Sequence, residues 1–400
     1  MKFHNAAIAV NHCWTSPFVR WQGSLADISS MDVASAVTQQ ALQRRGIGED
    51  DLDGLVVGLT IPQSNSFYAA PWLASRIGLP SLSGPAIAQA CATSVACVAA
   101  AAQQVEGHNG RAQLVITTDR TSNSPLMVFP RSNAMGGSPY TENWVLQSFA
   151  ADPNTGKAMV DTAENVARAG SMSRAALDDL TLLRWNQYQS ALADDRAAQR
   201  RYFEPITLPR GKGKTLVIDA DEGIHAYSAE SLASLKPVQP EGVVTFGSQT
   251  HPADGCAGAI VSTQDVARQF ARQAGGTGAV ATLLSAGTAR AEKAFMPKAA
   301  TTAALQALAD AGLSINDVRC VVTHNPFAVN DMWFAQQTGF DLERMNPLGC
   351  SLIYGHPQGP TGLRGIAELM QALVAAGGGV GLFTGCAAGD TGAALVLRVD

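Results

Sequence analysis

Two segments of the chain repeat one local pattern and restrict the fold more than any other feature. Residues 46–57 (GIGEDDLDGLVV) align without a gap with residues 312–323 (GLSINDVRCVVT). Each segment follows an alanine-rich stretch of helical pattern, and each continues through a glycine stop and a short polar turn into a β-rich strand. The repeat predicts two α/β halves related by duplication.

Stretches around the repeat fit helices and strands stacked in layers. Residues 112–118 (AQLVITT) and 380–385 (VGLFTG) predict buried strands, and residues 1–14 predict a first strand. Residues 92–105 and 362–376 predict helices that pack through small side chains. An α/β fold of alternating helix and sheet layers follows.

The stretch between the two halves has a different character. Residues 173–193 predict a long helix with Ser173 as its N-cap, and we expect the whole stretch to be an insertion that folds over the first half. The chain therefore divides into an N-terminal half, an inserted loop domain, a return segment of the N-terminal half and a C-terminal half, at residues 1–118, 119–248, 249–270 and 271–400.

Composition narrows the class of protein. The chain of 400 residues is 46% apolar and 15% charged. A large fraction of its residues must therefore be buried, as in a compact α/β protein or an oligomer. The net charge of −5 argues against nucleic-acid binding. No apolar run approaches a membrane span, and the first residues do not resemble a signal peptide. Seven scattered cysteines do not resemble a disulfide framework, so we expect a reducing, cytoplasmic location.

Two cysteines lie close together in residues 86–98, AIAQACATSVACV. A nucleophilic cysteine must ionise, which requires a neighbouring base or a helix N-terminus. Cys91 directly precedes the predicted helix, whose backbone N–H groups favour a thiolate. Cys97 lies inside that helix among alanine and valine, where a cysteine usually packs. Cys91 is therefore the candidate nucleophile.

Three further reactive side chains follow strands or lie in glycine-rich turns. His324 comes directly after the strand of the second repeat, and His356 lies in a Gly/Pro-rich turn that leads into a helix. Cys386 directly follows the strand at residues 380–385. This placement is typical of an α/β active site. The chain shows no local spacing of metal ligands, so we expect no metal.

Four motifs, in the same order, resemble those of the thiolase family. They are residues 349–364 (GCSLIYGHPQGPTGLR), 381–396 (GLFTGCAAGDTGAALV), 221–261 and 161–179. The resemblance extends over nearly the whole chain. It implies a five-layered αβαβα fold of two duplicated halves with an inserted loop domain.

The resemblance also implies a ping-pong acyltransferase that uses acyl-CoA and CoA as substrates and no other cofactor. Cys91 would take the acyl group, and His356 would activate Cys91. With His324, His356 would line an oxyanion site, and the Cys91 backbone N–H would contribute to a second one. Cys386 would move the proton at the α-carbon. The reaction would be cleavage of a 3-ketoacyl-CoA or condensation of two acyl-CoAs, as in lipid metabolism and β-oxidation.

Two stretches depart from the usual family pattern. His324–Phe327 reads His-Asn-Pro-Phe where many thiolases have Asn-Glu-Ala-Phe, and the histidine is similar to the sterol-carrier-protein-like branch. Ala388, Gly389 and Asp390 replace a run of glycines after the second cysteine. These departures leave the acyl group undetermined.

Two alternatives stay open from the sequence. One is a decarboxylating, ketosynthase-like condensing enzyme. The other is an acyl-CoA-binding thiolase subunit that needs a small OB-fold partner, as in benzoylsuccinyl-CoA thiolase. A homodimer or homotetramer is the family expectation. The residues that bind CoA are not assigned, because any of five basic residues of the insertion can face either the pyrophosphate or solvent: Arg131, Arg168, Arg174, Lys212 and Lys214.

Overall fold

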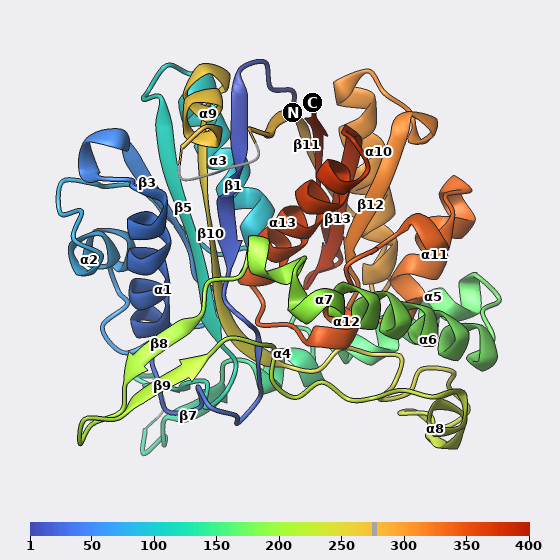
Figure 1. The fold of residues 1–400 in the computed structure, drawn as a ribbon. Coiled ribbons are helices and arrows are strands. Elements are labelled where there is room, and N and C mark those ends of the chain that lie inside the picture. Colours follow the sequence, from blue (N-terminus) through green and yellow to red (C-terminus); the bar gives the residue numbers. More distant parts are fainter. Residues whose placement is uncertain (134, 274–277) are drawn as a thin grey trace.

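The computed structural model describes residues 1–133, 135–273 and 278–400, and a mixed β-sheet forms its centre (Figure 1). Ten strands of the described chain belong to this sheet. Across the sheet, nine of them follow the order β12 (Val318–His324), β13 (Gly379–Ala387), β14 (Thr391–Val399), β11 (Val280–Arg290), β1 (Ala6–Thr15), β10 (Ala253–Thr263), β5 (Ala112–Arg120), β3 (Gly54–Gly58) and β4 (Ala86–Ile87). The remaining strand, β2 (Val19–Arg20), pairs with β10.

Both halves of the sheet have the same strand arrangement. In the N-terminal half, β3 is parallel to β5, and β5, β10 and β1 follow one another antiparallel. In the C-terminal half, β12, β13, β14 and β11 repeat these directions. The antiparallel pair β1–β11 joins the halves. The topology thus confirms the predicted duplication.

The sequence repeat corresponds to equivalent helix–turn–strand units. Helix α1 (Ser30–Arg45) ends at Gly46 and α10 (Met296–Ala311) ends at Gly312, with φ of 66° and 74°. This left-handed conformation favours glycine, which carries no Cβ. A 3-10 turn then leads into β3 in the first unit and into β12 in the second.

The helices complete five layers. Helices α3 (Thr93–Glu106) and α13 (Pro360–Ala375) lie between the half-sheets and share one core cluster with strands of both halves. Outside, α1, α2 (Ala69–Arg76) and α9 (Gln264–Ala271) cover the N-terminal strands, and α10 and α11 (Ala328–Thr338) cover the C-terminal strands (Figure 1). A Cβ added at Gly362 of α13 would lie 2.8 Å from the Cβ of Ser94 in α3, so this close approach requires glycine.

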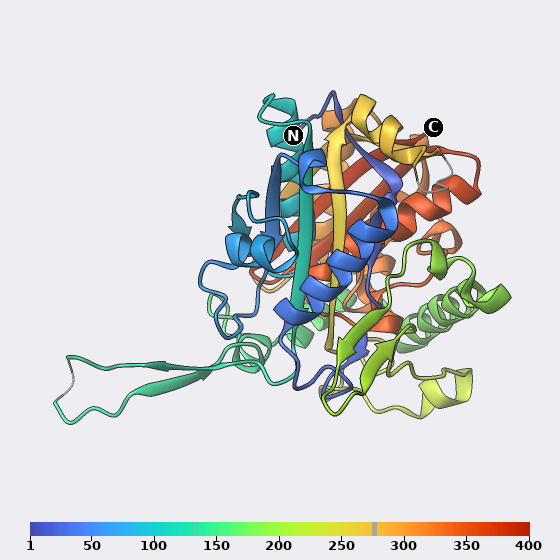
Figure 2. The same cartoon turned by 60° about the vertical axis from the view of Figure 1, so that its left-hand side comes forward.

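The chain between β5 and β10 forms the insertion, most of which runs in green along one end of the sheet (Figure 1). Its elements are β6 (Leu126–Phe129), β7 (Tyr140–Asn143), α4 (Leu146–Ala150), α5 (Met159–Ala169), α6 (Arg174–Ala191), α7 (Ala193–Arg196), β8 (Ile206–Pro209), β9 (Thr215–Ile218) and α8 (Ala229–Ser234). The β6–β7 hairpin projects far from the body of the molecule (Figure 2). Ser173 caps α6 as predicted, since its side chain accepts a hydrogen bond from the Ala176 N–H. Within the described ranges, no helix has the length and apolar character needed to cross a membrane.

The prediction that the insertion folds over the first half is only partly right. Strand β8 packs on α1, but α5 and α6 pack on α10, α11 and α12 (Ser351–Tyr354) of the second half. Val166 of α5 and Leu180 of α6 are buried in one cluster with Phe327 and Ile353. Helical periodicity identifies which face of a helix is apolar but not which element covers that face.

A buried ionic network attaches the insertion to the central helix. Arg364 of α13 donates two hydrogen bonds to the carboxylate of Asp221, at 2.7 and 2.8 Å, and a third to Glu368 at 2.9 Å. All three side chains are almost fully buried. Tyr202 and Tyr354 donate their hydroxyls to Glu368. Burial raises the pKa of Glu368 to about 7. One guanidinium therefore compensates two buried carboxyl groups.

Replacing this cation is expected to destabilise the protein strongly. In an Arg364→Met variant, Asp221 and Glu368 stay buried without a compensating cation, and only neutral donors such as Tyr188, Tyr202 and Tyr354 remain, so the free energy of unfolding should fall by about 3–5 kcal/mol. Chemical denaturation monitored by circular dichroism measures this change.

The matched control is an exposed ion pair. Arg268 pairs with Asp265 at 2.9 Å, and both side chains are largely exposed. Arg268→Ala should change the free energy of unfolding by less than about 0.5 kcal/mol. Equal losses in the two variants would contradict a special role for the buried network.

Candidate active site

Cys91 lies in a tight turn directly before α3. Ala90 has a φ of 45°, a conformation that is uncommon for alanine. The Thr93 hydroxyl holds this turn, because it accepts a hydrogen bond from Gln89 N–H at 2.8 Å and donates one to the Ala90 carbonyl at 2.7 Å. Cys91 is half-buried and Cys97 is fully buried in the central core. Of these two cysteines, only Cys91 therefore borders open space.

His356 faces the Cys91 sulfur from the turn before α13. Its Nε2 lies 3.1 Å from Cys91 Sγ, and its Nδ1 lies 2.6 Å from the Thr361 hydroxyl. The His356 backbone pairs with the chain at the start of β10: its N–H donates to the His251 carbonyl at 2.9 Å, and its carbonyl accepts from the N–H of Ala253, the first residue of β10, at 3.3 Å. When Nδ1–H donates to Thr361, Nε2 carries the lone pair and is the base that the thiol requires.

His324 ends β12 and stacks on His356, with ring centroids 4.0 Å apart. Its Nδ1 lies 2.9 Å from the Ser351 hydroxyl. Its Nε2 is buried and has no hydrogen-bond partner within the described part of the chain. Leaving a buried imidazole nitrogen without a hydrogen-bond partner costs free energy, so His324 Nε2 is suited to form a hydrogen bond with a polar group of a bound molecule.

Cys386, on β13, completes the set of predicted residues. Its sulfur accepts a hydrogen bond from the Asn330 side chain at 3.2 Å. Cys386, Cys91 and His356 line one cavity of about 300 Å³. The structure thus brings together the four residues named from the sequence, since His324 contacts His356 directly.

Burial controls the protonation of these groups. It raises the pKa of Cys91 to about 12 and that of Cys386 above its usual range. It lowers the pKa of His324 to about 3, and burial together with His324 lowers that of His356. The helix N-terminus was expected to favour a Cys91 thiolate, but the loss of solvation outweighs it. Cys91 and His356 therefore form a neutral thiol–imidazole pair.

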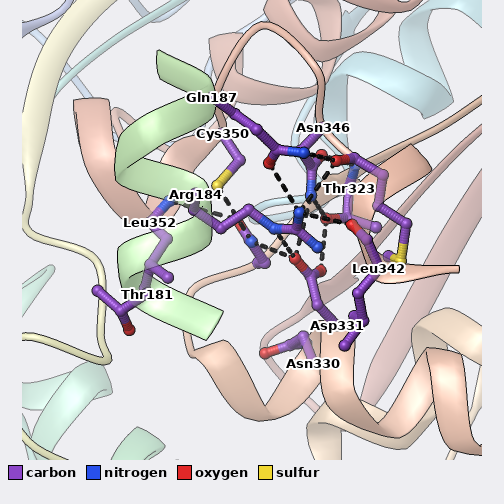
Figure 3. A network of polar contacts seen from close by, with 12 residues as sticks. Thr181, Arg184, Gln187, Thr323, Asn330, Asp331, Leu342, Asn346, Cys350 and Leu352 are labelled. Carbon is purple, nitrogen blue, oxygen red and sulfur yellow. Dashed lines mark hydrogen bonds and ion pairs between the residues drawn. The ribbon is translucent and has the colours of Figure 1, made fainter. Parts of the chain in front are cut away.

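A buried network fixes the segment that follows His324 (Figure 3). Asp331 of α11 accepts hydrogen bonds from Arg184 at 2.8 Å, Asn325 at 2.8 Å and Thr323 at 2.6 Å. Asn325 also accepts a hydrogen bond from Ser351, which contacts the His324 ring. The network therefore orients His324 through both of its sequence neighbours.

Sequence reasoning missed the polar residues that surround the four reactive groups. Gln358 Oε1 lies 3.3 Å from Cys91 Sγ. Ser351 contacts His324, Thr361 contacts His356, and Asn330 contacts Cys386. The sequence could have indicated these four residues, because all of them lie in or next to the stretches that contain His324 and His356.

Three side chains of the site are of kinds that can also bind a metal. One donor atom each of Cys91, His324 and His356 lies within 4.8 Å of the others. A thiolate and two imidazoles suit Zn²⁺. The expectation of no metal rested on local sequence spacing, which does not detect ligands that the fold assembles from separate elements.

The basic residues of the insertion differ in their surroundings. Arg174 is bound to Asp178 and to the carbonyls of Leu232 and Leu235. Arg131 lies over the Tyr140 ring in the β6–β7 hairpin. Arg174 is therefore committed to local structure.

Comparison with known proteins gives consistent similarities over the whole chain. Residues 8–265 match the family model of the thiolase N-terminal domain, and residues 277–399 match that of the thiolase C-terminal domain. The chain is 28% identical to an acetyl-CoA acetyltransferase of Paracoccus denitrificans, over 96% of this chain and 97% of the relative. It is also 28% identical to that of Escherichia coli (strain K12), over 94% and 95%.

Solved structures show the same fold. The acetyl-CoA acetyltransferase of Bacillus anthracis superposes with a TM-score of 0.90 at 23% identity, covering 100% of both chains. Human mitochondrial 3-ketoacyl-CoA thiolase in complex with CoA superposes with a TM-score of 0.89 at 23% identity, covering 100% of this chain and 99% of that chain.

The neutral thiol–imidazole pair predicts how Cys91 reacts with an alkylating reagent. Because the raised pKa leaves little thiolate at neutral pH, the rate constant for iodoacetamide should rise about tenfold per pH unit from about pH 6 to pH 9. Intact mass spectrometry follows the reaction, and Cys91→Ser supplies the background from the six buried cysteines of the described chain. A rate independent of pH around neutrality would instead indicate a preformed thiolate–imidazolium pair.

Proposed function

The chain belongs to the thiolase family, and on that premise we propose that it transfers acyl groups between CoA thioesters through an acyl group on Cys91. The main observation is the contact of Cys91 Sγ with His356 Nε2, at 3.1 Å, in a cavity that also contains Cys386. A thiol, its base and a second thiol at one cavity match the requirements of ping-pong acyl transfer.

Formation of the acyl-cysteine begins with proton transfer. The Cys91 S–H proton moves to His356 Nε2 while the sulfur attacks the substrate carbonyl carbon. In transfer from an acyl-CoA, the bond from that carbon to the CoA sulfur breaks, and the CoA sulfur takes the proton back from His356. The backbone N–H groups of Cys91 and Ala388 hold the oxygen on the attacked carbon. The contact of the Ala388 N–H with the Cys91 sulfur, which lowers the Cys91 pKa against the larger effect of burial, supports this position.

The carbon–carbon step requires a base at the α-carbon of the second substrate, and we assign it to Cys386. In condensation Cys386 first passes its S–H proton to His356 and then, as the thiolate, removes the α-proton. The carbanion attacks the acyl carbon on Cys91, whose sulfur leaves and takes the proton that His356 holds. In cleavage the same atoms move in reverse. His356 and His324 hold the oxygen of the enolate. For His324 this requires an Nε2–H, which it has when the single proton of the Ser351 hydroxyl points to Nδ1 and not to Asn325 Oδ1.

The two alternative functions are less well supported. A decarboxylating ketosynthase-like enzyme forms its carbanion by losing CO₂ and has no need of Cys386 beside Cys91. An acyl-binding subunit dependent on a small OB-fold partner has no need of a paired Cys91 and His356. We therefore propose a catalytic chain, with CoA as substrate, acting in lipid metabolism of the β-oxidation type. The free cysteines agree with a reducing cytoplasm.

We propose that the protein is a homodimer or homotetramer. Strand β4 lies at the edge of the sheet, where unpaired backbone groups favour association. Exposed apolar side chains gather on the projecting hairpin, including Leu126 and Val128, which are 65% and 60% exposed. Such exposed apolar residues are typical of protein interfaces.

We also propose that the chain divides into the four segments predicted from the sequence, with boundaries after residues 118, 248 and 270.

The acyl-cysteine gives the first test of this function. Acetyl-CoA should add one acetyl group to the wild-type protein, observed by intact mass, and none to Cys91→Ala. Cys386→Ala should still be acetylated, because its thiol is used only at the α-carbon, but its condensation rate should fall by at least about 100-fold. Loss of both activities in Cys386→Ala would contradict the assigned role, and absence of any adduct on the wild type would contradict the function.

The second test is the mass in solution. Size-exclusion chromatography with light scattering should give two or four times the 41.7 kDa of one chain. If the mass is that of a tetramer, replacing residues 126–143 with a short turn should yield dimers. A monomer would refute the proposal, and a small protein that co-purifies from the native host in equal amount would favour the OB-fold alternative.

A further inference from the structure

Gln358 is a buried polar residue in contact with the sulfur that reacts. Its side-chain Oε1 lies 3.3 Å from Cys91 Sγ, and only 6% of the residue is exposed. It lines the same cavity as Cys91, His356 and Cys386. No step of the reaction proposed above uses this amide, although it borders the atoms between which a proton moves.

The backbone of Gln358 is held in a conformation that favours glycine. Its φ is 65°, a left-handed value that costs free energy for a residue with a Cβ. Its carbonyl accepts a hydrogen bond from the Thr361 N–H at 3.2 Å. On the next residue, Gly359, the N–H donates to Asp119 at 2.8 Å and the carbonyl accepts from the Ser94 hydroxyl. These contacts fix the turn and keep a strained residue beside the thiol, and such residues cluster at functional sites.

The Cys91 thiol has one proton and two acceptors. His356 Nε2 lies 3.1 Å from the sulfur and Gln358 Oε1 lies 3.3 Å from it. Burial and the neighbouring His324 lower the pKa of His356, and a hydrogen bond with the Gln358 side chain raises it in part. An oxygen that accepts from the ring N–H has this effect, because it favours the charged form of the imidazole.

The proposed reaction places a positive charge on His356 in a buried site. Once the Cys91 sulfur has bonded to the carbonyl carbon, His356 carries the proton until the bond to the CoA sulfur breaks. During this interval the Cys91 sulfur is bonded to carbon and is only a weak acceptor. On the other side of the ring, His356 Nδ1 lies 2.6 Å from the Thr361 hydroxyl. The Nε2–H therefore needs an acceptor of its own, because a buried charge without one costs free energy.

We propose that Gln358 is a catalytic residue whose Oε1 accepts a hydrogen bond from the protonated Nε2 of His356 during acyl transfer. This inference rests on the proposed acyl transfer through Cys91. The S–H proton moves to His356 as the bond from the Cys91 sulfur to the carbonyl carbon forms, and it passes to the CoA sulfur as the bond from that carbon to the CoA sulfur breaks. Gln358 neither gains nor loses a proton, and it stabilises the charge that exists between these two events.

A comparison of two reactions of Cys91 tests this role. Acetylation by acetyl-CoA requires His356 to carry the proton, whereas alkylation by iodoacetamide uses the thiolate that loses its proton to solvent. Gln358→Met keeps the length of the side chain and removes the amide. At saturating acetyl-CoA, its acetylation rate constant should fall about 10- to 100-fold, the effect of a lost hydrogen bond to a charged group. Its alkylation rate constant should stay within about threefold of wild type, because an amide oxygen beside the sulfur does not favour the thiolate.

The matched control makes the same substitution elsewhere on the cavity. Gln249 also lines it, and in Gln249→Met acetylation and alkylation of Cys91 should change by the same factor. Rapid quenching and intact mass spectrometry measure both reactions. Circular dichroism verifies that the variants are folded, and Gln358→Leu replaces Gln358→Met if that variant is not.

The ratio of the two rate constants decides the outcome. A loss of acetylation alone in the Gln358 variant supports the proposal. Equal losses of both reactions would show a structural role and overturn it, and so would an unchanged acetylation rate. In these two cases an acetylated wild type leaves the proposed function intact, whereas a wild type that acetyl-CoA does not acetylate overturns the function and this inference together.

Discussion

The packing of α3 against α13, between the two half-sheets, is the contact on which the site depends. Cys91 directly precedes α3 and His356 lies in the turn before α13, so their 3.1 Å contact requires the starts of both helices to meet. Gly362 allows that approach, and Ser94 donates a hydrogen bond to the Gly359 carbonyl across it. Each helix comes from a different half of the chain. The duplication therefore creates an active site at the boundary between its copies.

Burial at this boundary has two opposing effects. It disfavours the Cys91 thiolate and the His356 imidazolium in the resting protein. The same low polarity strengthens every fixed dipole that acts on charge during reaction, including backbone N–H groups and the two stacked imidazoles. The site therefore keeps Cys91 and His356 neutral in the resting protein and stabilises the charge that develops when a substrate reacts.

Buried carboxylates hold the segments that carry the reactive groups. Asp331 orients the end of β12 and hence His324, Asp119 joins the His356 turn to the segment that follows β3 at Thr60, and Asp221 attaches the insertion to α13. Each has its oxygens satisfied by several donors, which makes a buried charge tolerable. Loops that are irregular in backbone thereby keep fixed positions.

The sequence by itself determined the two duplicated halves, because the glycine stops at Gly46 and Gly312 and the periodic apolar strands are local properties. It also made Cys91, His324, His356 and Cys386 candidates, because they lie near the ends of predicted strands and helices and in motifs that resemble those of the thiolase family; the structure places them together. Tertiary structure alone decided which half the insertion covers, the neutral state of the thiol–imidazole pair, and the contact of Gln358 with Cys91. These depend on desolvation and on neighbours distant in sequence, and no local pattern of residues encodes them.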